Sequence, residues 1–342
     1  MPVSEREKVT GMIKLSHNEN PYGASPLALK AIKDHYRSVY RYPDAVHRTL
    51  KEKLARKHDV SVENITIGSG AVGVVDLVIK ALVHADENVV TAEKTFVAYG
   101  FLAAINCRIC KRASMVENTI SLDSMRAQCD DKTKVVLIAN PNNPTGTIVS
   151  HGAVGEFLKA MPPHIVVVVD EAYAEYVTDG SYPNSLELQK TFDNLVILRS
   201  FSKIYGLAGL RIGYGIGHRD IMKTLEKSYT LFSVNRLAAV AALAALDDTE
   251  FVTKCARAND EQRSLLYGEL KGMGFNVTPS QGNFVMVEFS ASSERDRIFN
   301  ALKNNGIRVQ SLGPFGVDNG LRISVGRPEE NKQLLECLRG AG

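Results

Sequence analysis

A chain of 342 residues is longer than most single small domains and suits one large domain with a smaller one beside it. Hydrophobic residues make up 44% of it and charged residues 23%, which is typical of a globular protein whose core can enclose a small molecule. A net charge of +3 without a basic run gives no indication of binding to nucleic acid or to an acidic membrane.

The middle of the chain, residues 64–217, alternates short apolar runs with helical patterns. Residues 64–68 (NITIG) predict a strand and residues 71–83 predict a helix. Further strands are predicted at residues 88–92, 134–139, 165–170 and 195–199. These runs are apolar on both faces, so we expect an α/β fold with a mostly parallel sheet flanked by helices. Ligands bind such sheets at the carboxyl ends of the strands. The glycines of GYGIG, residues 213–217, are given only a packing role.

The last hundred residues have a different pattern. Residues 237–246 predict a buried helix, and residues 247–274 predict a long amphipathic helix. The predicted elements that follow are a strand at 284–289, a helix at 294–304, strands at 307–310 and 321–325, and a helix from Pro328. We therefore expect a small α+β domain built from residues 1–41 and 247–342, beside a large domain of residues 42–246.

The cysteines, the histidines and the start of the chain bear on location and metal binding. Five cysteines are sparse and odd in number, and no apolar segment opens the chain as a signal peptide would, so we expect a cytoplasmic, reducing setting. No apolar run reaches the roughly 18 residues of a membrane span. The histidines show no H-E-x-x-H spacing and Cys107 and Cys110 have no second pair, so no metal site is expected.

Lys203 follows the predicted strand at residues 195–199 directly, in the run Ser-Phe-Ser-Lys. Taken alone, it could be an ordinary lysine on a surface loop. A buried ammonium is costly, however, and the lowered lysine pKa that results is what Schiff-base chemistry requires. The hydroxyls of Ser200 and Ser202, with Arg211 eight positions after the lysine, would supply donors for a phosphate dianion.

Asp170 ends a run of four valines, which places a carboxylate at the rim of a buried strand. The ordinary reading is a helix N-cap. The functional reading is a counter-ion to a protonated pyridine nitrogen, which keeps such a ring an electron sink. Tyr173, three residues later, could donate a hydrogen bond to the phenolate oxygen of the same ring.

Two loops complete the pattern. The sequence NPNNPTGT after residue 139 predicts a fixed turn that could aim the Asn143 amide at the ring. The run Gly68 to Gly73 matches G-x-G-x-x-G, and Glu93 lies where the ribose-binding acid of a dinucleotide site would be. A dinucleotide site would leave Lys203, Asp170 and the asparagine turn unexplained. One phosphate joined to a pyridine ring explains these three features and the glycine loop.

Several motifs together resemble those of the histidinol-phosphate aminotransferases, which are fold-type-I enzymes that depend on pyridoxal phosphate. The motifs are LSHNENPYG, RYPD, NPNNPTG, VVVDEAY and SKIYGLAGLRIGY, and they cover the chain from Leu15 to about Leu335 in the family's order. The resemblance implies transamination, with L-histidinol phosphate and 2-oxoglutarate as substrates. An aromatic amino acid as donor, or decarboxylation of threonine phosphate on the same scaffold, remain alternatives.

The resemblance also implies a role for each matching residue. Lys203 would form the Schiff base and carry the proton, Asp170 would pair with the pyridine nitrogen, and Tyr173 and Asn143 would hold the phenolate oxygen. Phe96 would stack on the ring, although a lone Phe more often packs in a core. The phosphate would be held by the backbone amides of Gly70, Ala71 and Val72 and the side chains of Ser200, Ser202 and Arg211.

Three further residues are implied to contact the substrate or the neighbouring subunit. Arg322, with Tyr22 and Asn143, would bind the substrate, and the guanidinium would grip its anionic end. Tyr42 would reach the phosphate in the other subunit of a homodimer. One departure is Val72-Gly73, where the family usually has an acidic pair; the loss of a charge in a first helical turn costs roughly 0.3–1 kcal/mol.

Overall fold

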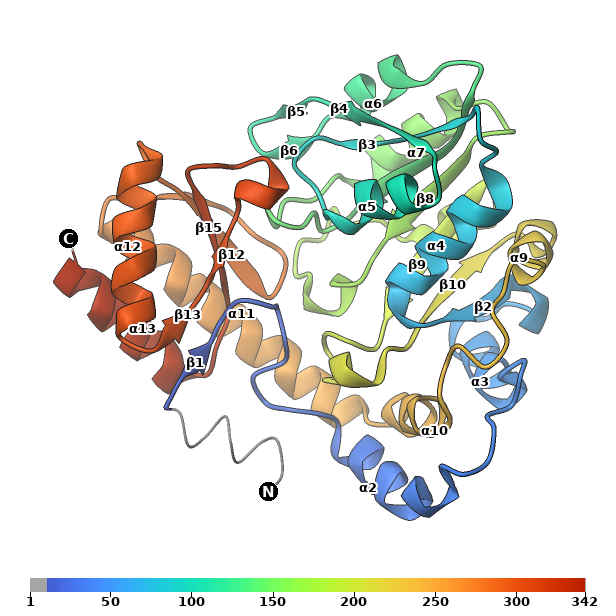
Figure 1. The fold of residues 1–342 in the computed structure, drawn as a ribbon, viewed down its shortest axis with the longest axis horizontal. Helices are drawn as coiled ribbons and strands as arrows, with labels where there is room; N and C mark the ends of the chain where they lie inside the picture. Colours follow the sequence, from blue (N-terminus) through green and yellow to red (C-terminus); the bar gives the residue numbers. More distant parts are fainter. Residues whose placement is uncertain (1–10, 342) are drawn as a thin grey trace.

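The computed structural model describes residues 11–341. It has two parts, each built on its own sheet, which lie side by side in Figure 1. The long helix α11 (Thr249–Gly272) runs from the larger part into the smaller one. The expected fold class, α/β with a mostly parallel sheet flanked by helices and a small α+β part, is confirmed.

The large sheet has seven strands in the order β2-β10-β9-β8-β7-β3-β4. The five strands from β9 to β4 are parallel, and β10 is antiparallel to both of its neighbours. The strands are β2 (Ile65–Gly68), β3 (Asn88–Ala92), β4 (Ile109–Ala113), β7 (Thr133–Ala139), β8 (Val166–Asp170), β9 (Leu195–Ser200) and β10 (Gly213–Gly217). The predicted strand ends therefore meet at one edge of one sheet.

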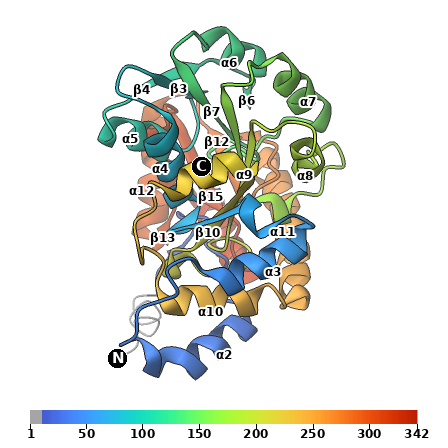
Figure 2. The same ribbon diagram turned by 90° about the vertical axis from the view of Figure 1, so that its right-hand side faces the viewer.

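The inner strands of the large sheet are buried on both faces, which is why they are largely apolar, whereas the edge strand β4 is partly exposed and contains Lys111 and Arg112. In β8, Val168 packs on one face, while Val167 and Val169 pack on the other. Figure 2 shows α4 and α5 on one side of the sheet and α3, α7 and α8 on the other. The helices around the sheet are α3 (Arg48–His58), α4 (Gly70–Leu82), α5 (Ala98–Ile105), α6 (Leu122–Gln128), α7 (His151–Ala160), α8 (Ser185–Gln189), α9 (Arg219–Glu226) and α10 (Arg236–Ala245).

Strand β10 was not expected, because its sequence GYGIG contains three glycines, which weaken a strand. The glycines serve close packing instead. A Cβ on Gly213 would collide with the backbone nitrogen of Ala71 and the carbonyl carbon of Gly70, at the start of α4. The glycines therefore have the packing role that was expected, and the segment, to which no element was assigned from the sequence, is a strand.

The small sheet has the order β11-β12-β15-β14 and is antiparallel. The predicted strand at residues 307–310 is divided in two. Its first half, β13 (Ile307–Arg308), pairs with β1 (Ile13–Lys14), and its second half, β14 (Gln310–Ser311), pairs with β15 (Gly320–Ser324). The other elements here are β11 (Asn276–Thr278), β12 (Phe284–Glu288), α12 (Ser292–Asn304) and α13 (Pro328–Ala341).

The N-terminal segment contacts both parts. Its residues 1–10 lie outside the described chain. Strand β1 joins the small part through β13, whereas α2 (Pro26–His35) packs on α10, as Figures 1 and 2 both show. Within residues 11–341, no helix has the length and apolarity to cross a membrane. The remaining elements are the hairpin β5 (Met115–Val116) and β6 (Thr119–Ile120) and short 3-10 turns at Tyr36–Ser38, Val62–Asn64, Ala174–Tyr176, Ala208–Leu210 and Gly313–Phe315.

Candidate active site

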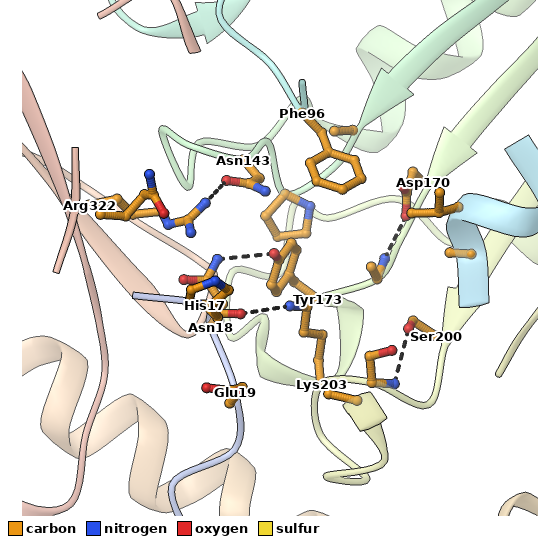
Figure 3. Close-up of a pocket in the computed structure, with 18 of the residues that line it drawn as sticks. His17, Asn18, Glu19, Phe96, Asn143, Asp170, Tyr173, Ser200, Lys203 and Arg322 are labelled. Carbon is orange, nitrogen blue, oxygen red and sulfur yellow. Dashed lines mark hydrogen bonds between the residues drawn. The ribbon is translucent and has the colours of Figure 1, made fainter. Parts of the chain in front are cut away.

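A cavity of about 380 Å³ lies at the carboxyl ends of β7, β8 and β9, with β15 of the small part on its other side (Figure 3). It gathers most of the residues expected from the sequence. Those on its wall are Ala71, Val72, Phe96, Asn143, Asp170, Tyr173, Ser200, Ser202, Lys203, Arg211 and Arg322. Lys203 and Asp170 therefore face the same space, as one shared ligand requires.

Asp170 is buried at the end of β8 and keeps two hydrogen bonds. Its Oδ2 accepts from the Tyr99 hydroxyl at 2.8 Å, and its Oδ1 accepts from the Ala172 nitrogen at 3.1 Å. Burial raises the pKa of Asp170, and the hydrogen bonds from Tyr99 and Ala172 oppose that rise. A buried carboxylate of this kind is stabilised by a cation or a protonated ring brought against it.

Lys203 lies in the loop after β9 and is half-buried rather than buried. Its Nζ donates to the carbonyl oxygen of His17 at 3.2 Å and lies 5.4 Å from the centroid of the Tyr173 ring. Figure 3 shows the side chain directed into the cavity, beneath Tyr173. The amine is therefore available to a ligand there.

One end of the cavity is shaped to accept an anion. Gly70 has φ +76° at the start of α4, and a Cβ there would lie 2.5 Å from Nη2 of Arg211. Nη1 of Arg211 donates to Ser202 Oγ at 3.3 Å, and Ser200 Oγ accepts from the Ser202 nitrogen at 3.0 Å. Ser69 gives α4 no side-chain cap, so amides of the first turn are left for a ligand. Gly70 itself is not among the residues that line the cavity, whereas Ala71 and Val72 are.

Arg322 stands at the opposite end, on β15, with only 5% of its surface exposed. Its guanidinium carbon lies 5.5 Å from the ring centroid of Phe284 and 5.3 Å from that of Phe315. Nη1 donates to Asn143 Oδ1, Nη2 donates to the Ser16 carbonyl at 2.7 Å, and Nε has no partner. Burial lowers the pKa of Arg322, and among residues 11–341 it forms no ion pair. A buried cation without a counter-ion favours an anionic ligand.

Asn143 and Tyr173 lie between these two ends. Because Asn143 Oδ1 accepts from Arg322, its amide nitrogen remains for another acceptor. The Tyr173 hydroxyl accepts a hydrogen bond from Nδ2 of Asn18 at 3.1 Å, and its ring packs edge-on against Phe284. Both side chains are visible in Figure 3 between Lys203 and Arg322.

Phe96 lies on the cavity wall with its ring edge-on to Tyr99, 5.6 Å between centroids. Tyr42 and Tyr22 do not reach this cavity. Tyr42 is 79% exposed and stacks on Phe232 at 4.8 Å, on the outer surface. Tyr22 is half-buried, with the guanidinium of Arg327 5.9 Å from its ring centroid.

Sequence reasoning gave no role to several residues of the wall. They are His17, Asn18, Glu19, Tyr99, Gln310 and Phe315. Burial, and then Lys14, lower the pKa of His17. The motifs contained His17, Asn18 and Glu19, but only the folded chain brings them to Lys203 and Tyr173.

The alternatives of a dinucleotide site and a metal site gain no support from the residues that the structure describes. Glu93, the acid of a dinucleotide site, is not on the cavity wall, and its Oε1 accepts from the Met115 nitrogen at 3.2 Å. Within residues 11–341, no group of histidine, cysteine and acidic side chains has the arrangement of a metal site.

Known proteins resemble the chain over almost its whole length. A family model described as aminotransferase class I and II matches residues 10–338. A histidinol-phosphate aminotransferase from Bacillus licheniformis is 39% identical over 343 residues, which cover 99% of this chain and 94% of that protein. Another from Anoxybacillus flavithermus is 38% identical over 336 residues, covering 98% and 90% respectively.

Solved structures agree in fold. The histidinol-phosphate aminotransferase from Sinorhizobium meliloti in complex with pyridoxal-5'-phosphate gives a TM-score of 0.90 at 27% identity, covering 100% of this chain and 95% of that one. L-Threonine-O-3-phosphate decarboxylase from Porphyromonas gingivalis gives 0.81 at 21% identity, covers 96% and 99%, and shares the fold. The chain belongs to the class I and II aminotransferases, in the family of the histidinol-phosphate aminotransferases, and is a transaminase that depends on pyridoxal phosphate.

Proposed function

We propose that this enzyme transfers the amino group of L-histidinol phosphate to 2-oxoglutarate, a step of histidine biosynthesis. The observation that carries this proposal is the cavity in which Lys203 and Asp170 face Arg322, a buried cation without a counter-ion. The names of relatives that share 38–39% of their residues with the chain support the same substrate.

The residues of the cavity fit pyridoxal phosphate. When bound, the cofactor supplies a pyridinium ring that withdraws electrons from the substrate carbon. Lys203 would hold the cofactor through its aldehyde group and would move the proton, while Asp170 would pair with the ring nitrogen. Asn143 and Tyr173 would donate to the ring oxygen, and Phe96 would pack on the ring. The phosphate would be held by the backbone amides of Gly70, Ala71 and Val72 and the side chains of Ser200, Ser202 and Arg211, and the glycine at φ +76° and the uncapped helix support this.

The substrate lies toward Arg322 in this proposal. Its anionic group pairs with the guanidinium, which has a free Nε and lies within 5.5 Å of the ring centroids of Phe284 and Phe315. Tyr22 is half-buried outside the cavity, so its contact with substrate depends on a movement of the N-terminal segment.

An aromatic amino acid is the second candidate donor. A single guanidinium between two phenylalanine rings suits one carboxylate next to an aromatic side chain, and Phe96 adds a third ring to the wall. In the cofactor loop, Val72-Gly73 also departs from the acidic pair that the family motif usually has.

A panel of single turnovers tests the choice. The holoenzyme is mixed with L-histidinol phosphate, phenylalanine or threonine phosphate, and the loss of the cofactor absorbance is followed. We expect the fastest conversion to pyridoxamine phosphate with L-histidinol phosphate. Faster conversion with phenylalanine would make the aromatic donor the substrate, and carbon dioxide release from threonine phosphate would make the enzyme a lyase.

The active unit in this proposal is a homodimer in the cytoplasm. Tyr42 and Phe232 belong to a surface rich in exposed apolar side chains, of the kind that a partner subunit covers. Tyr42 would reach the phosphate of the neighbouring site. The five cysteines are free thiols, in keeping with a reducing location. We also propose the domain limits of residues 42–246 for the large domain and of 1–41 with 247–342 for the small one.

A further inference from the structure

Residues 16–20, here called the crossing segment, pass between the large and small parts of the molecule beside the cavity. The Ser16 carbonyl accepts from Nη2 of Arg322 at 2.7 Å, and the His17 carbonyl accepts from Lys203 at 3.2 Å. Further along, Nδ2 of Asn20 donates to the Ile204 carbonyl at 2.8 Å. The segment thus touches the amine at one end of the cavity and the guanidinium at the other.

Asn18, at the centre of this segment, is buried and has every polar group bonded. Its backbone has φ +54°, a conformation that asparagine tolerates better than most residues. The backbone nitrogen donates to Ser324 Oγ at 2.8 Å, and the carbonyl accepts from Nδ2 of Asn283 at 3.0 Å. In the side chain, Oδ1 accepts from Ser324 Oγ at 2.9 Å and Nδ2 donates to the Tyr173 hydroxyl at 3.1 Å.

The donors and acceptors of these hydrogen bonds fix the orientation of the Asn18 amide. The Ser324 hydroxyl accepts from the Asn18 nitrogen and gives its own hydrogen to Oδ1, so the amide must turn Nδ2 toward Tyr173. The opposite amide orientation would leave the Ser324 hydrogen buried without an acceptor, which is unfavourable. Because Tyr173 accepts from Nδ2, its single hydrogen is free to point elsewhere.

We infer that Asn18 is a positioning residue, whose amide, oriented by Ser324, directs the hydrogen of the Tyr173 hydroxyl at the oxygen of the cofactor ring. The inference rests on the proposed role of Tyr173. Ser324 and Arg322 are two positions apart on β15, so the strand that carries the substrate-binding arginine also orients the ring contact. Figure 3 shows Asn18 between Arg322 and Tyr173.

The test uses the absorbance of the holoenzyme. A hydrogen bond to the ring oxygen stabilises its negative charge, so it lowers the pH at which the lysine-bound cofactor loses its proton. The charged and titratable groups on the same cavity wall as Tyr173 are kept in all variants; they are His17, Glu19, Tyr99, Asp170, Lys203, Arg211 and Arg322. The dissociation constant of pyridoxal phosphate is measured in parallel.

Asn18→Asp keeps the shape of the side chain but cannot donate, so the Tyr173 hydrogen turns to the new carboxylate. We expect the midpoint of the absorbance titration to rise by about 0.5–1 pH unit, the equivalent of one lost hydrogen bond. Tyr173→Phe should raise it by a similar amount. Ser324→Ala adds no charge and only frees the amide to turn, so we expect a smaller rise in the same direction.

Asn20→Asp is the matched control. It places the same charge in the crossing segment, at a buried asparagine that is not on the cavity wall, and should leave the midpoint unchanged. The titration midpoint of the double variant Asn18→Asp/Tyr173→Phe should be no higher than that of Tyr173→Phe alone, because both changes remove the same hydrogen bond. A general effect of charge, or a loosened segment, would add to it instead.

The outcomes distinguish a failure of the role of Asn18 from a failure of the role of Tyr173. A wild-type midpoint in Asn18→Asp, or an additive double variant, overturns the role of Asn18 while Tyr173 keeps its proposed role. An unchanged midpoint in Tyr173→Phe removes both. If Asn18→Asp does not fold, as its circular dichroism would reveal, Ser324→Ala decides, and a wild-type midpoint there overturns the inference.

Discussion

The two ends of the cavity are built in different ways. At the Lys203 end, four lining residues come from one short stretch that begins at the last residue of β9; they are Ser200, Ser202, Lys203 and Arg211. At the other end, Arg322 receives its orientation from Asn143 and Ser16, which are 179 and 306 positions away in the chain. Most side chains of the first end are thus near one another in the chain, although Lys203 also contacts His17, whereas the second end exists only after the two parts of the molecule have come together.

The largest expected effect is at the Lys203 end. Lys203→Ala should lower kcat by at least about 10²–10⁴-fold, because the amine that carries the proton is gone. Thermal unfolding should stay near wild type, since the side chain is half-buried and has one hydrogen bond. Lys190→Ala, at an exposed lysine, is the control. Near-native turnover in Lys203→Ala would contradict the proposed chemistry.

Asp170→Asn should slow the single-turnover half-reaction by roughly 10²-fold or more, because the anionic partner of the ring nitrogen is lost in a buried place. Asparagine can keep both side-chain contacts, with Oδ1 accepting from the Ala172 nitrogen and Nδ2 donating to the Tyr99 hydroxyl oxygen, so the variant removes chiefly the charge. Stopped-flow absorbance measures the rate, and Asp193→Asn, at an exposed carboxylate, serves as control. An unchanged rate would exclude Asp170 as the counter-ion.

Arg322→Leu tests whether substrate binding at one end of the cavity is independent of cofactor binding at the other. We expect KM for the amino donor to rise about 10–100-fold, the loss of one or two charged hydrogen bonds, while the dissociation constant of pyridoxal phosphate stays the same. Steady-state kinetics and a cofactor titration on the same preparation measure both. A large loss of cofactor affinity would show that the ends are not independent.

Tyr42→Phe should have the smallest effect, a rise of up to about tenfold in the dissociation constant of pyridoxal phosphate. The proposal gives the Tyr42 hydroxyl one hydrogen bond to the phosphate of the neighbouring site, and phenylalanine cannot form it. Tyr40→Phe, at an equally exposed ring, is the matched control, and light scattering should report a dimer for both. If the affinity of Tyr42→Phe equals that of Tyr40→Phe, the partner does not complete the site through this hydroxyl.

The sequence predicted the parts of the molecule in which local pattern decides structure. The buried strands of the large sheet are apolar runs, and their ends carry Asp170, Asn143 and Lys203, so both the strands and the site at their edge could be foreseen. Strand β10 was not predicted because glycine has a low strand propensity. Its place in the sheet involves close packing against α4, which the local sequence does not reveal.

Tertiary contacts account for what was missed. Tyr99 lies on helix α5 among core residues, and only the fold brings its hydroxyl to Asp170. Asn18 meets Ser324 across 306 positions, which no spacing rule covers. Tyr22 belongs to the same motif as Asn18, yet the turn that follows Asn20 directs it away from the cavity.

Gly213 has a consequence for anyone who alters this enzyme. The residue is not on the cavity wall, and a survey of ligand contacts would leave it free to vary. Its missing side chain nevertheless lets the first turn of α4 lie directly on the sheet. Variants with a side chain at position 213 would therefore bind the cofactor less tightly, although this residue does not line the cavity. We expect this effect even for alanine, the smallest such side chain.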